Sequence, residues 1–144
     1  MRDGWQFVRK GFMSVFLICL GACFGALLRH ALGLLLNPVT NFLPLGTLTA
    51  NLVGAFLAGL IFAFLLDLPC ADRWRLLLVT GFLGALTTFS SFSLEVTHFL
   101  VQGRFVQACV TLIAHVCGSL LLTGCGFAVY RMLQRVWPFL QGRI

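Results

Sequence analysis

Long apolar runs separated by short polar breaks dominate the chain and predict four membrane-spanning helices. The runs cover about residues 12–36, 46–66, 74–100 and 105–130 of the 144-residue sequence. Each is long enough to cross a bilayer core, which takes about 20 mostly apolar residues. Asn37 and Pro38 end the first run, because proline disfavours helix in the residue before it. The pattern therefore predicts an all-α membrane protein with a single four-helix domain over residues 1–144.

The composition agrees with a lipid environment. Hydrophobic residues make up 60% of the chain and charged residues only 10%, whereas a soluble domain is roughly 45–50% apolar and about 25% charged. A chain of this length cannot bury so much apolar side chain in its own core, because small domains have a high ratio of surface to volume. We therefore expect membrane lipid to cover most of its surface.

The N-terminus allows a second interpretation. Arg2, Arg9 and Lys10 precede an apolar run that ends in Leu-Gly-Ala-Cys at residues 20–23. This pattern resembles a bacterial signal peptide with a lipoprotein cleavage site. Apolar residues continue past this point towards spanning length, which favours a first membrane span.

The basic residues indicate an orientation, since four spans place both termini on one side of the membrane. The basic residues on that side are Arg2, Arg9, Lys10, Arg73, Arg75, Arg131, Arg135 and Arg143. The opposite side carries Arg29 and Arg104, so the positive-inside rule places both termini in the cytoplasm. These anchoring positions also account for the net charge of +6. We expect no nucleic-acid partner, because the sequence has no basic stripe or known binding motif.

The ionisable residues do not suggest a catalytic or metal-binding cluster. The acids are Asp3, Asp67, Asp72 and Glu95, and the histidines are His30, His98 and His115. No triad of nucleophile, base and orienting acid can be assembled from them, so we expect that the protein is not an enzyme. The cysteines are Cys19, Cys23, Cys70, Cys109, Cys117 and Cys125. They form no C-x-x-C pair, and cysteine in an apolar run behaves as a small hydrophobe.

Hydroxyl groups are concentrated in the middle of the third run. Residues 87–93 read Thr-Thr-Phe-Ser-Ser-Phe-Ser, so five of seven side chains carry a hydroxyl. Gly81 and Gly84 precede them, and both residue types weaken a helix. We therefore expect the third helix to break over residues 87–93, near the bilayer midplane. The alternative is an intact helix whose hydroxyls bond to the preceding turn.

A break at this depth has functional consequences. Unpaired backbone groups are costly in hydrocarbon, so the break must be buried against protein or line a wet cavity. Its freed carbonyls can hold a cation, and its freed amides or hydroxyls can hold an anion. Phe89 and Phe92 lie within it, and the positive edge of an aromatic ring can face a small anion. From the residues alone, packing or lipid contact is the simpler role for these two rings.

The second run has an amide within the membrane. Asn51 lies on a stripe of small or polar residues with Thr47, Gly54 and Ala58, and small residues let helices approach closely. The Asn51 amide should therefore face the protein interior. There it can donate to an anion, donate to the broken backbone, or form a structural bond between helices.

Four other polar residues have two interpretations each. Arg29 follows a Gly-x-x-x-Gly packing motif and either snorkels to the interface or attracts anions at a vestibule. Glu95, the only acid within a span, either lies in a water-filled vestibule or caps the broken helix. Ser119 and Thr123 share one face of the fourth run, where they form a polar track or are ordinary membrane-helix hydroxyls.

Three stretches resemble the Fluc/CrcB family of fluoride channels. They are residues 21–29 (GACFGALLR), 46–59 (GTLTANLVGAFLAG) and 81–93 (GFLGALTTFSSFS). The third is specific in order and spacing, and the resemblance extends along almost the whole chain. It implies a dimer of oppositely oriented four-helix subunits in a bacterial inner membrane. Such a channel would export fluoride from the cytoplasm and lower its toxicity.

The resemblance also implies roles for individual residues. The fluoride pore would include Asn51, Phe89, Phe92, Ser90, Ser91, Ser119 and Thr123. Arg29 and Glu95 would occupy vestibule positions, and the backbone carbonyls of Gly84 and Thr87 would hold a structural sodium ion at the dimer interface. The sequence departs from the family pattern at His30, Ala55 and Ser91, and none of these changes removes a pore residue.

The basic residues and the embedded acid each allow more than one interpretation. A chain that inserts in both orientations should show little bias in its basic residues. The bias here indicates a preference for one orientation. The dimer is then either a homodimer or a heterodimer with a homologous, oppositely inserted subunit. The competing functions are a proton-coupled exporter, for which Glu95 is the only embedded acid, and a structural subunit of a larger membrane complex.

Overall fold

The computed structural model describes residues 2–69 and 71–140, with side chains over 11–69 and 71–136, and contains no strand in these ranges. Its elements are α1 (Arg2–Leu36), η1 (Asn37–Val39), α2 (Leu45–Leu66), α3 (Asp72–Trp74), η2 (Arg75–Leu83), α4 (Gly84–Leu86), α5 (Phe89–Val101) and α6 (Phe105–Leu140). η1 is a 3₁₀ turn, whereas η2 is a π-helix. α3, η2, α4 and α5 follow one another as a single interrupted rod.

Four stretches of the described chain are long and apolar enough to cross a membrane. They are Gly11–Val39, Leu45–Leu66, Asp72–Val101 and Phe105–Val136. The predicted all-α, four-span fold is therefore confirmed, and the chain is a multi-pass membrane protein. Large apolar side chains such as Phe12 and Leu27 are mostly exposed on its surface, as expected of groups that contact lipid.

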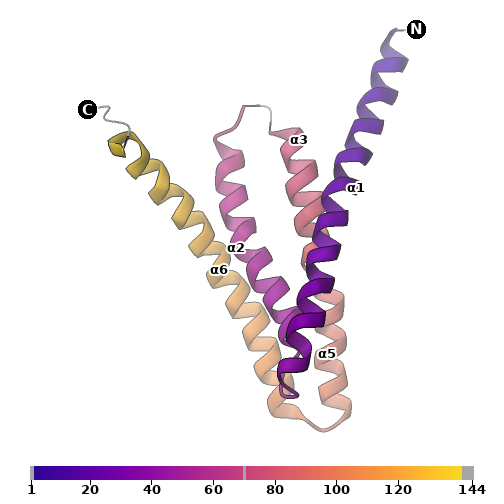
Figure 1. Cartoon of the computed structure of the whole chain (residues 1–144), viewed down its shortest axis with the longest axis vertical. Helices are drawn as coiled ribbons and strands as arrows, with labels where there is room; N and C mark the ends of the chain where they lie inside the picture. Colours follow the sequence, from indigo (N-terminus) through magenta and orange to yellow (C-terminus); the bar gives the residue numbers. More distant parts are fainter. Residues whose placement is uncertain (1, 70, 141–144) are drawn as a thin grey trace.

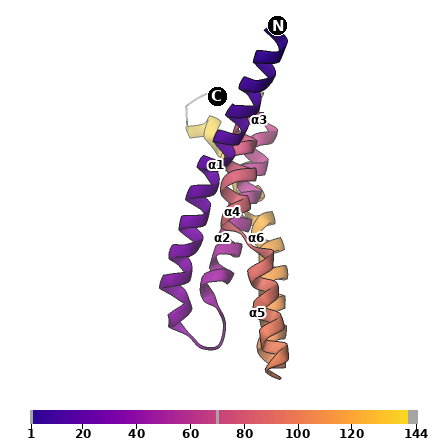
Figure 2. The same cartoon turned by 90° about the vertical axis from the view of Figure 1, so that its right-hand side faces the viewer.

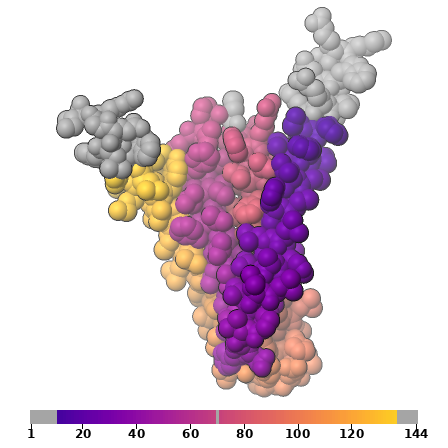
Figure 3. Space-filling view, in the orientation of Figure 1, coloured from indigo at the N-terminus to yellow at the C-terminus, as the bar shows by residue number. Residues whose placement is uncertain are grey.

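The two termini lie at the same end of the molecule, as an even number of spans requires (Figure 1). α1 and α6 diverge towards that end, which gives the bundle a V-shaped outline with α2 and the third span between them (Figures 1 and 3). In the side view, α5 continues the third span away from α1 and runs beside α6 (Figure 2).

Some sequence predictions concern residues that the structure does not describe. Cys70 and Arg143 lie outside the described residues, and so do the side chains of Arg2, Arg9 and Lys10. The other five cysteines are free thiols on the exposed surface of the described chain.

Glycines allow the spans to pack with their backbones in contact. A Cβ atom on Gly21 of α1 would collide with the carbonyl oxygen of Leu77, and one on Gly25 would collide with that of Phe82. The Gly-x-x-x-Gly motif of α1 therefore lies directly against the backbone of η2. α2 and α6 approach each other in the same way at Gly59.

The third span is interrupted at two residues, Thr87 and Thr88. Their ψ angles of 153° and 115° are extended, and α5 begins directly after them at Phe89. The interruption is shorter than the predicted break over residues 87–93, because Thr88 caps α5 and the following residues wind into helix. The hydroxyl of Ser93, predicted inside the break, donates to the Phe89 carbonyl at 2.8 Å, which is the bond expected of an intact helix.

Candidate functional site

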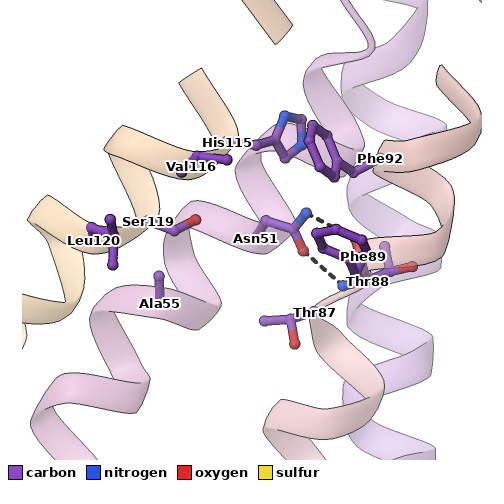
Figure 4. Close-up of a pocket in the computed structure, with 10 residues that line it drawn as sticks. All are labelled: Asn51, Ala55, Thr87, Thr88, Phe89, Phe92, His115, Val116, Ser119 and Leu120. Carbon is purple, nitrogen blue, oxygen red and sulfur yellow. Dashed lines mark hydrogen bonds between the residues drawn. The ribbon is translucent and has the colours of Figure 1, made fainter. Parts of the chain in front are cut away.

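A groove of about 400 Å³ lies beside this interruption, bordered by α2, α5 and α6 (Figure 4). Its lining residues are Asn51, Ala55, Thr87, Thr88, Phe89, Phe92, His115, Val116, Ser119 and Leu120. Four of the predicted pore residues are therefore brought together here: Asn51, Phe89, Phe92 and Ser119. None of the lining residues is an aspartate, glutamate, lysine or arginine, so the groove offers dipoles and ring edges to a ligand instead of full charges.

The Asn51 side chain pairs with the interrupted backbone. Its Nδ2 donates to the Thr88 carbonyl at 3.0 Å, and its Oδ1 accepts from the Thr88 amide at 2.7 Å (Figure 4). The backbone amide can only donate, so it fixes which end of the side chain is the oxygen. Nδ2 carries two hydrogens, and the Thr88 carbonyl accepts only one of them. The amide therefore holds the break in place and keeps one donor for another partner.

Hydroxyl groups complete the local hydrogen bonding around Thr88. Its Oγ1 accepts from the Ser91 amide at 3.2 Å, which caps α5. The same oxygen lies 3.1 Å from the hydroxyls of Ser90 and Ser91. These two serines were predicted to line the pore, but they belong to the cap and are absent from the groove lining. In the single chain, their place is beside the break and outside the groove.

The last carbonyl groups before and at the interruption lose their usual helical partners, and those of Gly84 and Thr87 are among them. In a continuous α-helix, each carbonyl accepts from the amide four residues later. The partner of Gly84 would be the Thr88 amide, which donates to Asn51, and that of Thr87 would be the Ser91 amide, which donates to Thr88. Gly84 and Thr87 are the two residues whose carbonyls were predicted to hold sodium.

Two phenylalanines and a histidine form a row along one side of the groove (Figure 4). The Phe89 and Phe92 rings are 5.4 Å apart between centroids and meet edge to face, with an interplanar angle of 67°. The Phe92 ring in turn lies 4.6 Å from the His115 ring, at 33°. Phe92 and His115 are buried, whereas Phe89 is 78% exposed in the single chain.

The α6 wall carries Ser119 within the groove, while Thr123 lies one turn further along. The Thr123 hydroxyl makes short contacts with two carbonyl oxygens, at 3.1 Å to Ala55 and 2.9 Å to Ser119. It therefore joins α6 to α2, and it is absent from the groove lining. Of the predicted polar track, only Ser119 reaches the groove in the single chain.

The predicted vestibule residues lie away from the groove. Glu95 lines a separate pocket of about 270 Å³ near η1 and the start of α2. One of its oxygens accepts from the Thr47 hydroxyl at 2.5 Å, and the other, Oε2, is buried without a hydrogen-bond partner in the described chain. Arg29 is half-buried on α1 and lines neither cavity.

Sequence reasoning missed three residues of this region. Thr88 was counted in the hydroxyl run but not assigned its capping role. Thr47 was placed on the Asn51 stripe without a partner, and His115 was given no role. A usable signal existed for His115, since it precedes Ser119 by four residues and therefore shares its face of the helix.

Comparison with known proteins gives consistent matches. The family described as CrcB-like protein, Camphor Resistance (CrcB), matches residues 16–127. A fluoride-specific ion channel FluC of Chromobacterium violaceum is 49% identical over 123 residues, which cover 85% of this chain and 98% of the relative. Proteins of the same name from Pseudomonas aeruginosa and Albidiferax ferrireducens are 50% and 55% identical, over 85% and 79% of this chain and 98% and 88% of theirs.

Proposed function

The chain belongs to the Fluc/CrcB family, a family of ion channels and not of enzymes, and on this premise we propose that it conducts fluoride out of the cytoplasm. Its location would be a bacterial inner membrane, and export would lower the toxicity of fluoride in the cell. The relatives named above are fluoride-specific ion channels, and the similarity covers nearly their whole length.

The groove beside the interruption is the observation that carries this proposal. Fluoride is small and strongly hydrated, so a pore must replace its water with several donors in register. The free N–H of Asn51, the Ser119 hydroxyl and the edges of Phe89 and Phe92 are donors of that kind. Because no lining residue is an aspartate, glutamate, lysine or arginine, fluoride would be stabilised without a lysine or arginine ion pair that holds it too tightly to leave.

A second subunit is part of the proposal. Phe89 is 78% exposed in the single chain, and the polar groups of the groove would otherwise face lipid, where they are costly. An oppositely inserted subunit that packs over this face would bury the groove and bring two interruptions together. That partner is either a second copy of this chain or a homologous subunit.

We also propose that sodium binds at the centre of this dimer. The carbonyls of Gly84 and Thr87 have lost their helical donors, and oxygen dipoles released by a broken helix suit a small cation. Each subunit would supply two oxygens, so a site between two subunits would have four. When bound, the ion would neutralise the carbonyl dipoles and hold the two interruptions together.

Fluoride efflux from liposomes that contain only the purified protein tests the channel function. We expect rapid, passive efflux of fluoride and little efflux of chloride. Efflux that requires a proton gradient would instead favour a coupled exporter. If no fluoride moves, with or without a gradient and with or without a co-purified homologous subunit, the proposal is wrong.

The orientation is tested in intact cells. A cysteine-free variant with Thr40→Cys would carry one thiol, in the loop between η1 and α2, for an impermeant maleimide. Fixed orientation with cytoplasmic termini predicts labelling of this thiol from outside in nearly every molecule. Labelling of about half of the molecules before permeabilisation, and of the other half only after it, would indicate dual insertion and a homodimer.

A further inference from the structure

His115 is the groove residue whose role the fluoride pathway leaves unexplained. It is only 4% exposed, yet it borders the groove and lies against Phe92, with ring centroids 4.6 Å apart and planes 33° from parallel. The contact therefore covers one face of the Phe92 ring. The Phe92 ring also meets the Phe89 ring edge to face.

The hydrogen bonding of His115 determines what its ring can offer. Nδ1 lies 3.0 Å from the carbonyl oxygen of Thr111, one turn earlier on α6. A carbonyl only accepts, so Nδ1 carries the hydrogen and the neutral ring has a lone pair at Nε2. Nε2 is buried and has no hydrogen-bond partner in the described chain. A neutral His115 fixed in this way presents no donor to an anion.

We propose that His115 is a positioning residue that sets the orientation of the Phe92 ring, and this proposal rests on the proposed fluoride channel. The face of an aromatic ring is negative and its edge is positive. By covering one face of Phe92, His115 blocks rotation of that ring, so that its edge remains available to fluoride. The Thr111 carbonyl holds the imidazole in the plane that this contact requires.

Three variants separate this role from others. His115→Phe keeps a flat ring and removes both nitrogens, whereas His115→Leu keeps apolar volume and removes the flat ring. Ile113→Leu changes an exposed residue of the same helix and serves as the control. Each would be reconstituted for fluoride and chloride efflux, and dimer assembly would be checked by size-exclusion chromatography in detergent.

The positioning role predicts different outcomes for the two histidine variants. His115→Phe should keep fluoride efflux and the preference for fluoride over chloride near wild type. His115→Leu should lower fluoride efflux roughly three- to tenfold, the range expected when one aromatic contact is lost, and should reduce the preference for fluoride. The assembled dimer should remain in both.

Two outcomes would overturn the proposal. If His115→Phe loses efflux as severely as His115→Leu while the dimer persists, the imidazole nitrogens act directly on the ion or on a proton. If His115→Leu keeps wild-type efflux and selectivity, the contact does not orient Phe92. Wild-type protein without any fluoride efflux would contradict the channel itself, so the two failures are distinguishable.

Discussion

The side-chain amide of Asn51 replaces hydrogen bonds that the third span loses at Thr88, donating to its carbonyl at 3.0 Å and accepting from its amide at 2.7 Å. This pairing lets a helix break inside a membrane protein without leaving both groups of the residue unpaired. It also links the proposed pore to the fold, because the same side chain belongs to both.

Asn51→Ala should therefore affect both function and stability. Fluoride efflux should fall strongly, and the apparent stability in detergent should decrease by about 1–3 kcal/mol for each buried backbone group left unpaired. Asn51→Asp is the informative comparison, because it can still accept from Thr88 but can no longer donate. Efflux assays and thermal unfolding of both variants would check this, and unchanged values for Asn51→Ala would contradict the assigned pairing.

Phe89→Ala should behave differently. The ring is mostly exposed in the single chain, so its removal should cost the fold of one subunit little. Fluoride efflux should nevertheless fall roughly three- to tenfold if the ring edge contacts the ion in the dimer. Measuring fluoride efflux and dimer content in the same preparation separates a loss of conduction from a loss of assembly. Wild-type efflux in both Phe89→Ala and Asn51→Ala would exclude them as pore residues.

Thr88→Val should weaken the start of α5. Valine keeps the shape of threonine but removes the oxygen that accepts from the Ser91 amide, and loss of such a cap typically costs about 1 kcal/mol. Thr88→Ser retains the oxygen and is the matched control. Amide hydrogen exchange over residues 89–93 should become faster in Thr88→Val only, and equal exchange in the two variants would argue against the cap.

Gly25→Ala should disrupt the packing of α1. The added Cβ would collide with the Phe82 carbonyl, and it would also approach the Leu86 amide nitrogen to 2.9 Å. Backbone atoms cannot move aside as a flexible side chain can. The overpacking should therefore lower the free energy of unfolding by about 1–3 kcal/mol or more. Gly124→Ala, which meets no atom within 4 Å, should be neutral or slightly stabilising. Thermal unfolding of the two variants provides the comparison.

Sodium removal should lower the stability of the dimer. In buffers where N-methylglucamine replaces sodium, the midpoint temperature of thermal unfolding should be lower for the detergent-solubilised protein. Adding sodium should raise this temperature again in a saturable manner. Potassium at equal ionic strength controls for salt. The same midpoint temperature in sodium, potassium and N-methylglucamine would contradict a sodium site at the carbonyls of Gly84 and Thr87.

The sequence was sufficient for the four spans and for the position of the interruption, because both follow from local properties. Run length sets the spans, and the density of hydroxyl groups after Gly84 marks the weak point of the third helix. The extent of the break was overestimated, since residues that weaken a helix interior can also cap a new one, as Thr88 does.

Contacts between distant segments could not be predicted in the same way. The residues left three roles open for Asn51, and only the approach of α2 to the third span selects the backbone pairing. The π-helix η2 has no comparable sequence signal, and it coincides with the closest approach of α1. Ser90 and Thr123 carry the hydroxyl groups expected in a pore, but their positions depend on their partners. The Ser90 hydroxyl lies beside that of Thr88, and the Thr123 hydroxyl contacts the carbonyl oxygens of Ala55 and Ser119.

The pairing of Asn51 with Thr88 also has a consequence for how the protein is made. The third span carries its interruption into hydrocarbon, where the backbone of Thr88 has no water to bond. α2 precedes the third span in the chain, so the ribosome delivers Asn51 to the membrane before Thr88 emerges. We therefore expect the third span to be inserted as a stable element only when the second is already in place, and a transplanted third span to integrate poorly alone.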